Sequence, residues 1–71
     1  MIKKEILVSL VRDNLLHDKI FLKLKYRQST ISQSFKRCID RNKISGRTHD
    51  PAVLEIIKKH LKLTDKQLFE S

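Results

Sequence analysis

The chain has 71 residues, of which 39% are hydrophobic, and its 16 Lys and Arg residues against 8 Asp and Glu residues give a formal net charge of +8 at pH 7. With a single Gly and a single Pro, this composition excludes a disordered or loop-rich chain, and the length predicts one domain over residues 1–71. The one cysteine, Cys38, excludes an internal disulfide and favours a reducing cytoplasm. The uncharged run Ile6–Val11 is too short for the core of a signal peptide or for a membrane span, so we expect a cytoplasmic protein with no membrane partner.

The positive charge is concentrated in the middle of the chain. Residues 23–47 contain eight cations and one anion, Asp40, whereas the rest of the chain is nearly balanced. A concentrated basic surface is typical of a protein that binds a polyanion such as nucleic acid. The alternative is a basic surface that only keeps the protein in solution.

The first two elements are predicted to be helices. Apolar residues recur at helical spacing before Asp13 and predict an amphipathic helix that ends near that residue. A second helix is predicted from His17 to about Lys25. The residues expected to be buried are Ile2, Ile6, Leu7, Leu10 and Val11 in the first helix and Ile20, Phe21 and Leu24 in the second.

The polar segment "YRQSTISQSFKR", from Tyr26 to Arg37, is also predicted to be helical. Ile31, Phe35 and Cys38 have the spacing i, i+4, i+7 and therefore share one side of a helix. The polar residues gather on a different side, and an irregular loop would not sort them in this way. We expect this helix to begin near Gln28, to end near Ile39 and to present a face formed by Gln28, Ser29, Ser32, Gln33 and Lys36.

The last third of the chain predicts a basic loop and two further helices. Residues 40–50 break the periodicity and contain the only Gly. Asp50 is the expected N-cap of a fourth helix, and Pro51 suits its first turn. A short fifth helix over "DKQLFE" follows a capping-box pair, Thr64 and Gln67. Leu54, Ile57 and Leu61 are the expected buried residues of the fourth helix, and Leu63 and Leu68 occupy the staple positions around Thr64.

Two short helices, the second with amides and hydroxyls beside cations, suggest a helix-turn-helix that binds DNA. Gln can pair with adenine through two hydrogen bonds in the major groove, and Ser can bond to either a donor or an acceptor. Lys and Arg at the phosphates supply affinity and fix the register, but they do not identify the bases.

The residues that carry this pattern resemble a known family. "LLHDKIFLKLKYRQSTIS" (Leu15–Ser32) is similar, without a gap, to the helix-turn-helix core of the phage Cro/CI-like repressor family, also called the XRE family, and "LKLTDKQLF" (Leu61–Phe69) resembles its closing segment. The resemblance implies an all-α fold, a compact five-helix bundle of the lambda-repressor-like helix-turn-helix type, with the motif over about 17–39. It also implies a transcriptional repressor of phage or prophage type, acting in the bacterial cytoplasm or nucleoid or in a phage-infected host cell.

The same resemblance implies roles for individual residues. The residues expected to face base edges are Gln28, Ser29, Ser32 and Gln33. Those expected to contact phosphates are His17, Lys36, Arg41, Lys43 and Arg47, with Arg27 and Arg37 added because their charges lie at the ends of the recognition helix.

The sequence departs from the family pattern at several positions. Lys25 and Lys62 stand where the family has turn glycines, so left-handed backbone at these two positions would be strained. Phe21 replaces a small residue, so we expect the two helices of the motif to pack further apart. Ser34 and Phe35 reverse the usual order of apolar and polar residues, and Arg37 replaces the Gly that often ends the recognition helix.

The expected partner is a double-stranded DNA operator with two-fold symmetry, bound by a homodimer, because one such domain covers about one half-site. We expect no separate oligomerisation domain in so short a chain. The dimer surface is therefore predicted on the fifth helix, at Leu68 and Phe69.

Other classes of function have weaker support. Cys38, His49 and His60 lack the spacing of a metal site, and Ser45, His49 and Asp50 lack the pocket of a hydrolase, so we expect no enzyme, metal, cofactor or small-molecule substrate. Two alternatives remain open: a protein-interaction module on the same fold, such as an anti-repressor or antitoxin-like partner, and a nucleic-acid binder without sequence preference.

Overall fold

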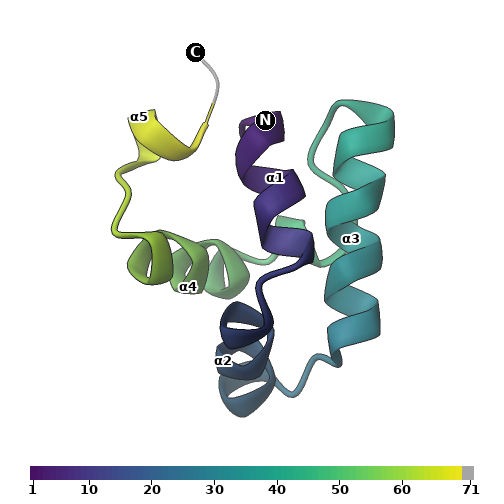
Figure 1. The fold of residues 1–71 in the computed structure, drawn as a ribbon, viewed down its shortest axis with the longest axis vertical. Coiled ribbons are helices and arrows are strands. Elements are labelled where there is room, and N and C mark those ends of the chain that lie inside the picture. The colour runs from purple at the N-terminus through teal and green to yellow at the C-terminus, as the bar shows by residue number, and fades with distance from the viewer. Residues whose placement is uncertain (70–71) are drawn as a thin grey trace.

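Five α-helices and one 3-10 turn follow one another in the computed structural model, which describes residues 1–69 (Figure 1). Within these residues the only strand-like pairing is an isolated bridge between Ile2 and Phe69, so the predicted all-α fold is confirmed. No helix of residues 1–69 combines the length and the apolar character needed to cross a membrane. The elements are α1 (Lys4–Val11), α2 (Asn14–Leu24), α3 (Gln28–Arg41), η1 (Gly46–His49), α4 (Pro51–Leu61) and α5 (Asp65–Leu68).

One apolar core holds the helices together. α1 packs against α3, α2 packs against α4, and η1 lies between α3 and α4. The predicted stripe of Ile31, Phe35 and Cys38 is buried, which confirms the face of α3 that points inward. Each large apolar side chain buried in this way contributes about 1.5–3 kcal/mol. The core residues are Ile2, Leu7, Leu10, Leu16, Ile20, Ile31, Phe35, Cys38, Val53, Ile56, Ile57 and Leu68.

The ends of three helices differ from the prediction. α5, predicted over residues 65–70, ends at Leu68, and Glu70 lies outside the described residues. α2 begins at Asn14 rather than His17 because Asp13 caps it: Asp13 Oδ1 accepts a hydrogen bond of 3.1 Å from the Leu16 N–H. α3 continues past Ile39 to Arg41, and Asn42 ends it with left-handed backbone. The motif proposed over about 17–39 therefore corresponds to helices that together span residues 14–41.

The start of α4 is confirmed, but its buried face is rotated from the prediction. Asp50 Oδ1 accepts a hydrogen bond of 2.9 Å from the Ala52 N–H, and Pro51 occupies the first turn. Ile57 is buried as expected. Leu54 and Leu61, which we also expected to be buried, are only half-buried, and Val53 and Ile56 take their places in the core.

Both lysines that stand in place of the family's turn glycines adopt left-handed backbone. Lys25 ends α2 with φ 62° and Lys62 ends α4 with φ 55°. Both residues stop a helix whose last carbonyls need partners: the Lys25 N–H donates to the Phe21 carbonyl at 2.9 Å. Phe21, which we expected to be buried, is 46% exposed, and Lys25 Nζ lies 5.6 Å from the centre of its ring.

α5 packs on the N-terminal residues of the chain. The Lys3 N–H donates to the Leu68 carbonyl at 3.0 Å, and the side chains of Ile2 and Leu68 are both fully buried. The predicted capping box is present, with the Thr64 N–H donating to Gln67 Oε1 at 2.9 Å. The prediction of a dimer surface at Leu68 is therefore wrong, because this side chain completes the core of its own chain; Phe69 is half-buried beside it.

Candidate nucleic-acid interface

α3 lies at one side of the bundle (Figure 1). Its buried residues point to the core, so its polar face points away from it. The helix buries Ile31, Ser34, Phe35 and Cys38, and the remaining sides carry almost only polar residues. Of the predicted base-reading residues, Gln28, Ser29 and Gln33 are exposed, and Ser32 is half-buried. The four residues lie on the first two turns of one rigid helix.

Gln28 connects the start of α3 to the start of α2. Its Nε2 donates to Asn14 Oδ1 at 3.0 Å, and the contact is exposed to solvent. The bond orients the Gln28 side chain between the first turns of the two helices. A side-chain amide carries two N–H donors and one carbonyl acceptor, so one such bond leaves it further bonding capacity.

The cations around this face form no ion pair with an acidic residue within residues 1–69. Every ion pair within residues 1–69 uses Lys58, Lys59 or His60, and none uses a cation of residues 23–47. The positive charge of this region is therefore available to an external anion. Six predicted phosphate contacts are exposed: Arg27, Lys36, Arg37, Arg41, Lys43 and Arg47.

The seventh predicted phosphate contact, His17, is wrong. Because Asp13 starts α2 one turn earlier than expected, His17 lies inside the helix, on the face that also buries Leu16. Its imidazole is 2% exposed, with Nε2 3.3 Å from the Val11 carbonyl and the ring centre 6.0 Å from that of Phe35. A side chain in this position cannot reach a phosphate at the surface.

The 3-10 turn η1 is fastened to α3 by polar contacts that hold Arg47 beside the helix. Ser34 Oγ donates to the Thr30 carbonyl and accepts from the Arg47 N–H, both at 3.0 Å. Gly46, with φ 59°, lies so close that an added Cβ would be 2.6 Å from Ser34 Oγ. Only glycine fits this approach without strain, which explains the single Gly of the chain.

A second set of contacts fixes the same turn from inside. The Ser45 N–H donates to Cys38 Sγ at 3.3 Å and to Thr48 Oγ1 at 3.1 Å. The Thr48 hydroxyl donates back to the Ser45 carbonyl, and both residues are buried. The second half of the loop predicted over residues 40–50 is thus held against α3 by hydrogen bonds.

Arg47 is also held from its outer side. Its guanidinium carbon lies 4.8 Å from the centre of the Tyr26 ring, and the Tyr26 hydroxyl donates to Asp50 Oδ2 at 2.7 Å. That hydrogen bond, together with the Ala52 N–H and despite some burial, lowers the pKa of Asp50, and it raises the pKa of Tyr26. The stacked arginine is therefore oriented before any ligand binds.

Between α3 and η1 lies a polar hollow of about 390 Å³. It brings together two of the predicted phosphate contacts, Arg37 and Arg47, and one predicted base-reading residue, Gln33. Two guanidinium groups around one hollow can bind an oxyanion through several charged hydrogen bonds. The lining residues are Thr30, Gln33, Ser34, Arg37, Gly46 and Arg47.

The sequence did not reveal the residues that position Arg47. The single Gly was a signal for Gly46, but it indicated a loop and not a close approach to α3. Ser34 was noted only as a departure from the family pattern, and no feature of the sequence linked Tyr26 to Asp50. These contacts join residues that are far apart in the chain, so periodicity cannot predict them.

The residues considered for a metal site lie in different surroundings. Cys38 is buried against Ser45, His60 contacts Asp13, and His49 is exposed. The described part of the chain contains no group of three His, Cys, Asp or Glu residues that could hold a metal ion.

Comparison of the chain with protein-family models, with curated proteins and with solved structures gives no match.

Proposed function

We propose that the protein is a sequence-specific double-stranded DNA-binding transcriptional regulator, a repressor of the Cro/CI-like type. One observation carries the proposal: α3 presents exposed amides on its outer face and is surrounded by exposed cations without ion-pair partners in residues 1–69. A face of this kind has the two kinds of group that a duplex requires, one for the bases and one for the phosphates.

The proposed mode of binding places α3 in the major groove, which is about 12 Å wide and admits one helix. Gln28, Ser29 and Gln33 then reach base edges from the first turns of the helix. Arg37 and Arg47 contact phosphates at one edge of the groove. Lys36, Arg41 and Lys43 contact other phosphates along α3. Repression needs only occupancy of a promoter, so no catalytic group is required.

The proposed assembly is a homodimer on an operator with two-fold symmetry. One chain of this size covers about one half-site, and two half-sites lie about one helical turn apart. Because Leu68 belongs to the core, the contact between the two chains is proposed to involve surface residues outside α5.

A selection from random duplexes tests this function. The bound sequences are compared with scrambled DNA of the same length over a series of salt concentrations. We expect the selected duplex to have dyad symmetry and to be bound with an affinity at least roughly 10³ times that for scrambled DNA. Equal affinity for all duplexes would instead identify a nucleic-acid binder without sequence preference, and no affinity for duplexes would remove the proposal.

A further inference from the structure

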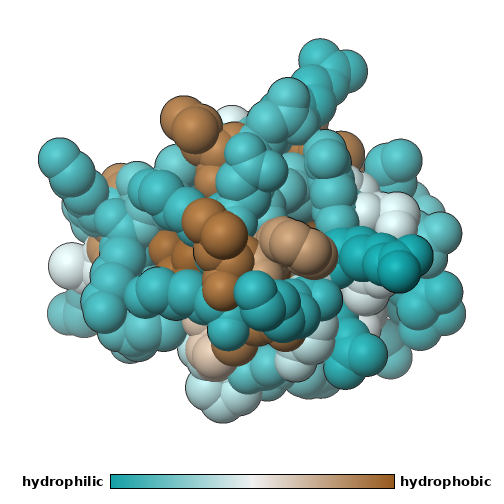
Figure 2. Space-filling view, turned by 90° about the horizontal axis from the view of Figure 1, so that it is seen from below, coloured by the Kyte–Doolittle hydropathy of each residue, from teal (hydrophilic) through white to brown (hydrophobic). Residues whose placement is uncertain are grey.

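A second surface lies between α2 and α4, away from α3. The two helices, which lie in the lower part of Figure 1, line a groove of about 360 Å³. Seen from below, apolar side chains gather near the middle of the surface, and hydrophilic side chains surround them (Figure 2). The groove is lined by Lys19, Leu22, Lys23, Glu55, Ile56, Lys59 and His60.

The apolar part of this groove is formed by one side chain from each helix. Ile56 is buried and belongs to the core, whereas Leu22 is 70% exposed. Two other large apolar residues of α2, Leu15 and Phe21, are also exposed. A concave apolar surface with polar edges is typical of a site that binds another molecule.

The edges of the groove are positively charged. Lys19, Lys23 and Lys59 lie around it, and the one anion is Glu55, whose carboxylate is 3.9 Å from Lys59 Nζ. Opposite charges on an incoming ligand would therefore be attracted from three sides.

One wall of the groove is fixed by a chain of polar contacts. Lys19 Nζ lies 3.0 Å from His60 Nδ1, and His60 Nε2 lies 2.8 Å from Asp13 Oδ2. Because an ammonium group can only donate, Nδ1 accepts from Lys19, and Nε2 donates to Asp13. α2 and α4 are thus held together at the groove before a ligand arrives.

We infer that this groove binds an acidic amphipathic helix of a partner protein. Leucines or other large apolar residues on one side of such a helix would pack on Leu22 and Ile56, and Glu or Asp residues beside them would form ion pairs with the three lysines. A second copy of this chain is a poor occupant, because a two-fold contact would bring the lysines of both copies together. DNA is a poor occupant because it would leave the apolar surface without a partner.

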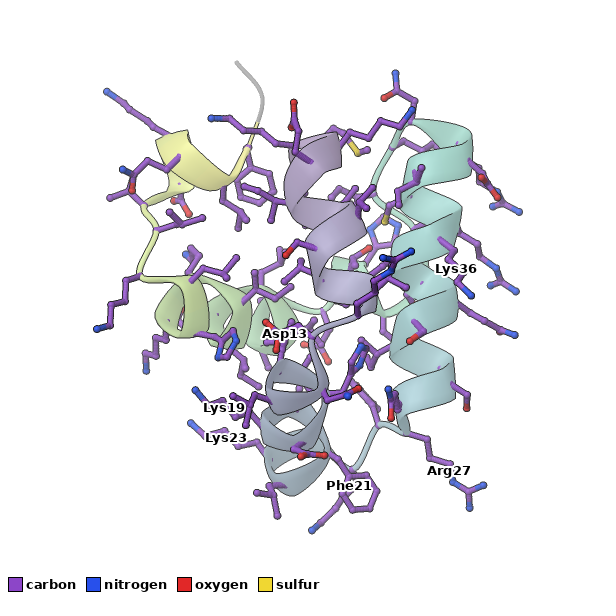
Figure 3. The ribbon with its side chains drawn as sticks, viewed as in Figure 1. Asp13, Lys19, Phe21, Lys23, Arg27 and Lys36 are labelled. Carbon is purple, nitrogen blue, oxygen red and sulfur yellow. The ribbon has the colours of Figure 1, made fainter. Side chains whose placement is uncertain are left out.

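The inference goes beyond DNA binding and does not depend on it. Figure 3 shows Lys19 and Lys23 extending from α2 toward the side of α4, whereas Arg27 and Lys36 lie on the side of α3. A partner in the groove would leave the polar face of α3 free.

The test uses the full chain, labelled with ¹⁵N, and a synthetic helical peptide that has leucines on one side and glutamates elsewhere. A peptide of the same composition with the leucines spread around the helix is the control. We expect saturable amide shifts at Lys19, Leu22, Lys23, Ile56 and Lys59 with the first peptide and roughly tenfold weaker binding of the second.

Two matched pairs of variants locate the site. Leu22→Gln is expected to weaken binding roughly tenfold, the effect of losing one buried leucine contact, whereas Val8→Gln, a change at an exposed apolar residue of α1 outside the groove, is expected to have no effect. Lys59→Gln is expected to weaken binding severalfold, and Lys36→Gln on α3 is not. All four side chains are exposed, so we expect each variant to fold, and the amide spectra of the free variants will check this.

Several results would overturn the inference. They are a failure of the acidic peptide to saturate the protein, equal binding of both peptides, and shifts concentrated on α3. A self-associated wild-type protein that becomes monomeric on Leu22→Gln would also overturn it, because the occupant would then be a second copy of the chain.

Discussion

Asp13 stabilises the fold through two contacts at once. Its carboxylate caps α2 through the Leu16 N–H and contacts His60 on α4 at 2.8 Å. Partial burial alone would raise the pKa of Asp13, but the Leu16 N–H, the hydrogen bond and charge of His60 and the charge of His17 together lower it below 3.8. The ionised form is thus favoured in the folded protein, so its stabilising effect is present above about pH 3.8 and is lost as the pH falls through the lower folded-state pKa.

We predict that Asp13→Asn lowers the free energy of unfolding at pH 7 by about 1 kcal/mol, since the amide can still cap α2 but carries no charge for His60. Urea titrations from pH 7 to pH 2 should show this difference shrinking below pH 3.8. Asp18→Asn, at an exposed position of the same helix, is the control. A difference that stays constant over the whole pH range would contradict the account of Asp13.

Gln33 is a proposed base-reading residue that lines the hollow with Arg37 and Arg47. We predict that Gln33→Ala costs about 1–3 kcal/mol on the selected duplex and relaxes the preference at one or two base pairs. Affinity for scrambled DNA should not change. If Gln33→Ala weakens binding to every duplex equally, this amide does not read bases.

α5 shows how a short element can belong to the core. A helix of four residues has few internal hydrogen bonds, but Leu68 is fully buried, and its carbonyl accepts a hydrogen bond from the Lys3 N–H. The helix therefore closes the bundle against the N-terminal residues, next to the bridge between Ile2 and Phe69.

We predict that Leu68→Ala lowers the free energy of unfolding by about 2–5 kcal/mol, the range for a leucine removed from a packed core. Chemical denaturation measures this value, and Lys66→Ala, an exposed change in the same helix, should cost far less. Sedimentation of Leu68→Ala measures the mass of the assembly in solution. A variant with unchanged stability that forms a smaller assembly than the unmodified chain would place Leu68 at an interface and contradict its place in the core.

The elements differ in how well the sequence predicted them. The apolar stripe of α3 and the caps of α4 and α5 were correct because each depends on residues within two turns of one another. The start of α2 was wrong because "DNLL" was assigned to a connection, although Asp13 is a good N-cap. Moving that start by one turn is what placed His17 inside the bundle.

The candidate site was predicted in part. The exposure of Gln28, Gln33 and the six cations agrees with the pattern of the sequence, because it follows from the orientation of one helix. The contacts of Ser34 with Arg47, of Tyr26 with Asp50 and of Leu68 with the core join distant segments. Such contacts depend on how the helices pack in three dimensions, and the periodicity of a single sequence does not predict that packing.

For the whole molecule, the distribution of charge separates two regions. Lys58 pairs with Asp65 at 3.0 Å and with Glu55 at 3.8 Å, and the hydrogen bond to Asp65 raises the pKa of Lys58. Residues 23–47, which include α3, contain Asp40 as their one anion. The lysines at the junction of α4 and α5 are thus paired with carboxylates of the chain, whereas the cations of residues 23–47 form no ion pair within residues 1–69 and can attract a polyanion.

We predict that Lys43→Ala weakens binding to every duplex and reduces the slope of log affinity against log salt by about one. Lys4→Ala, which removes an exposed charge from α1, should leave the slope unchanged. An unchanged slope for Lys43→Ala would exclude Lys43 from the phosphate contacts.

The most direct test of the proposed interface is to map the selected duplex on the ¹⁵N-labelled chain by amide chemical shifts. The predicted result is a set of saturating shifts over residues 27–43 and at Arg47, while Leu22, Ile56 and Lys59 in the groove between α2 and α4 stay unchanged. Shifts concentrated in that groove, with Gln28 and Gln33 unmoved, would contradict the placement of α3 in the DNA.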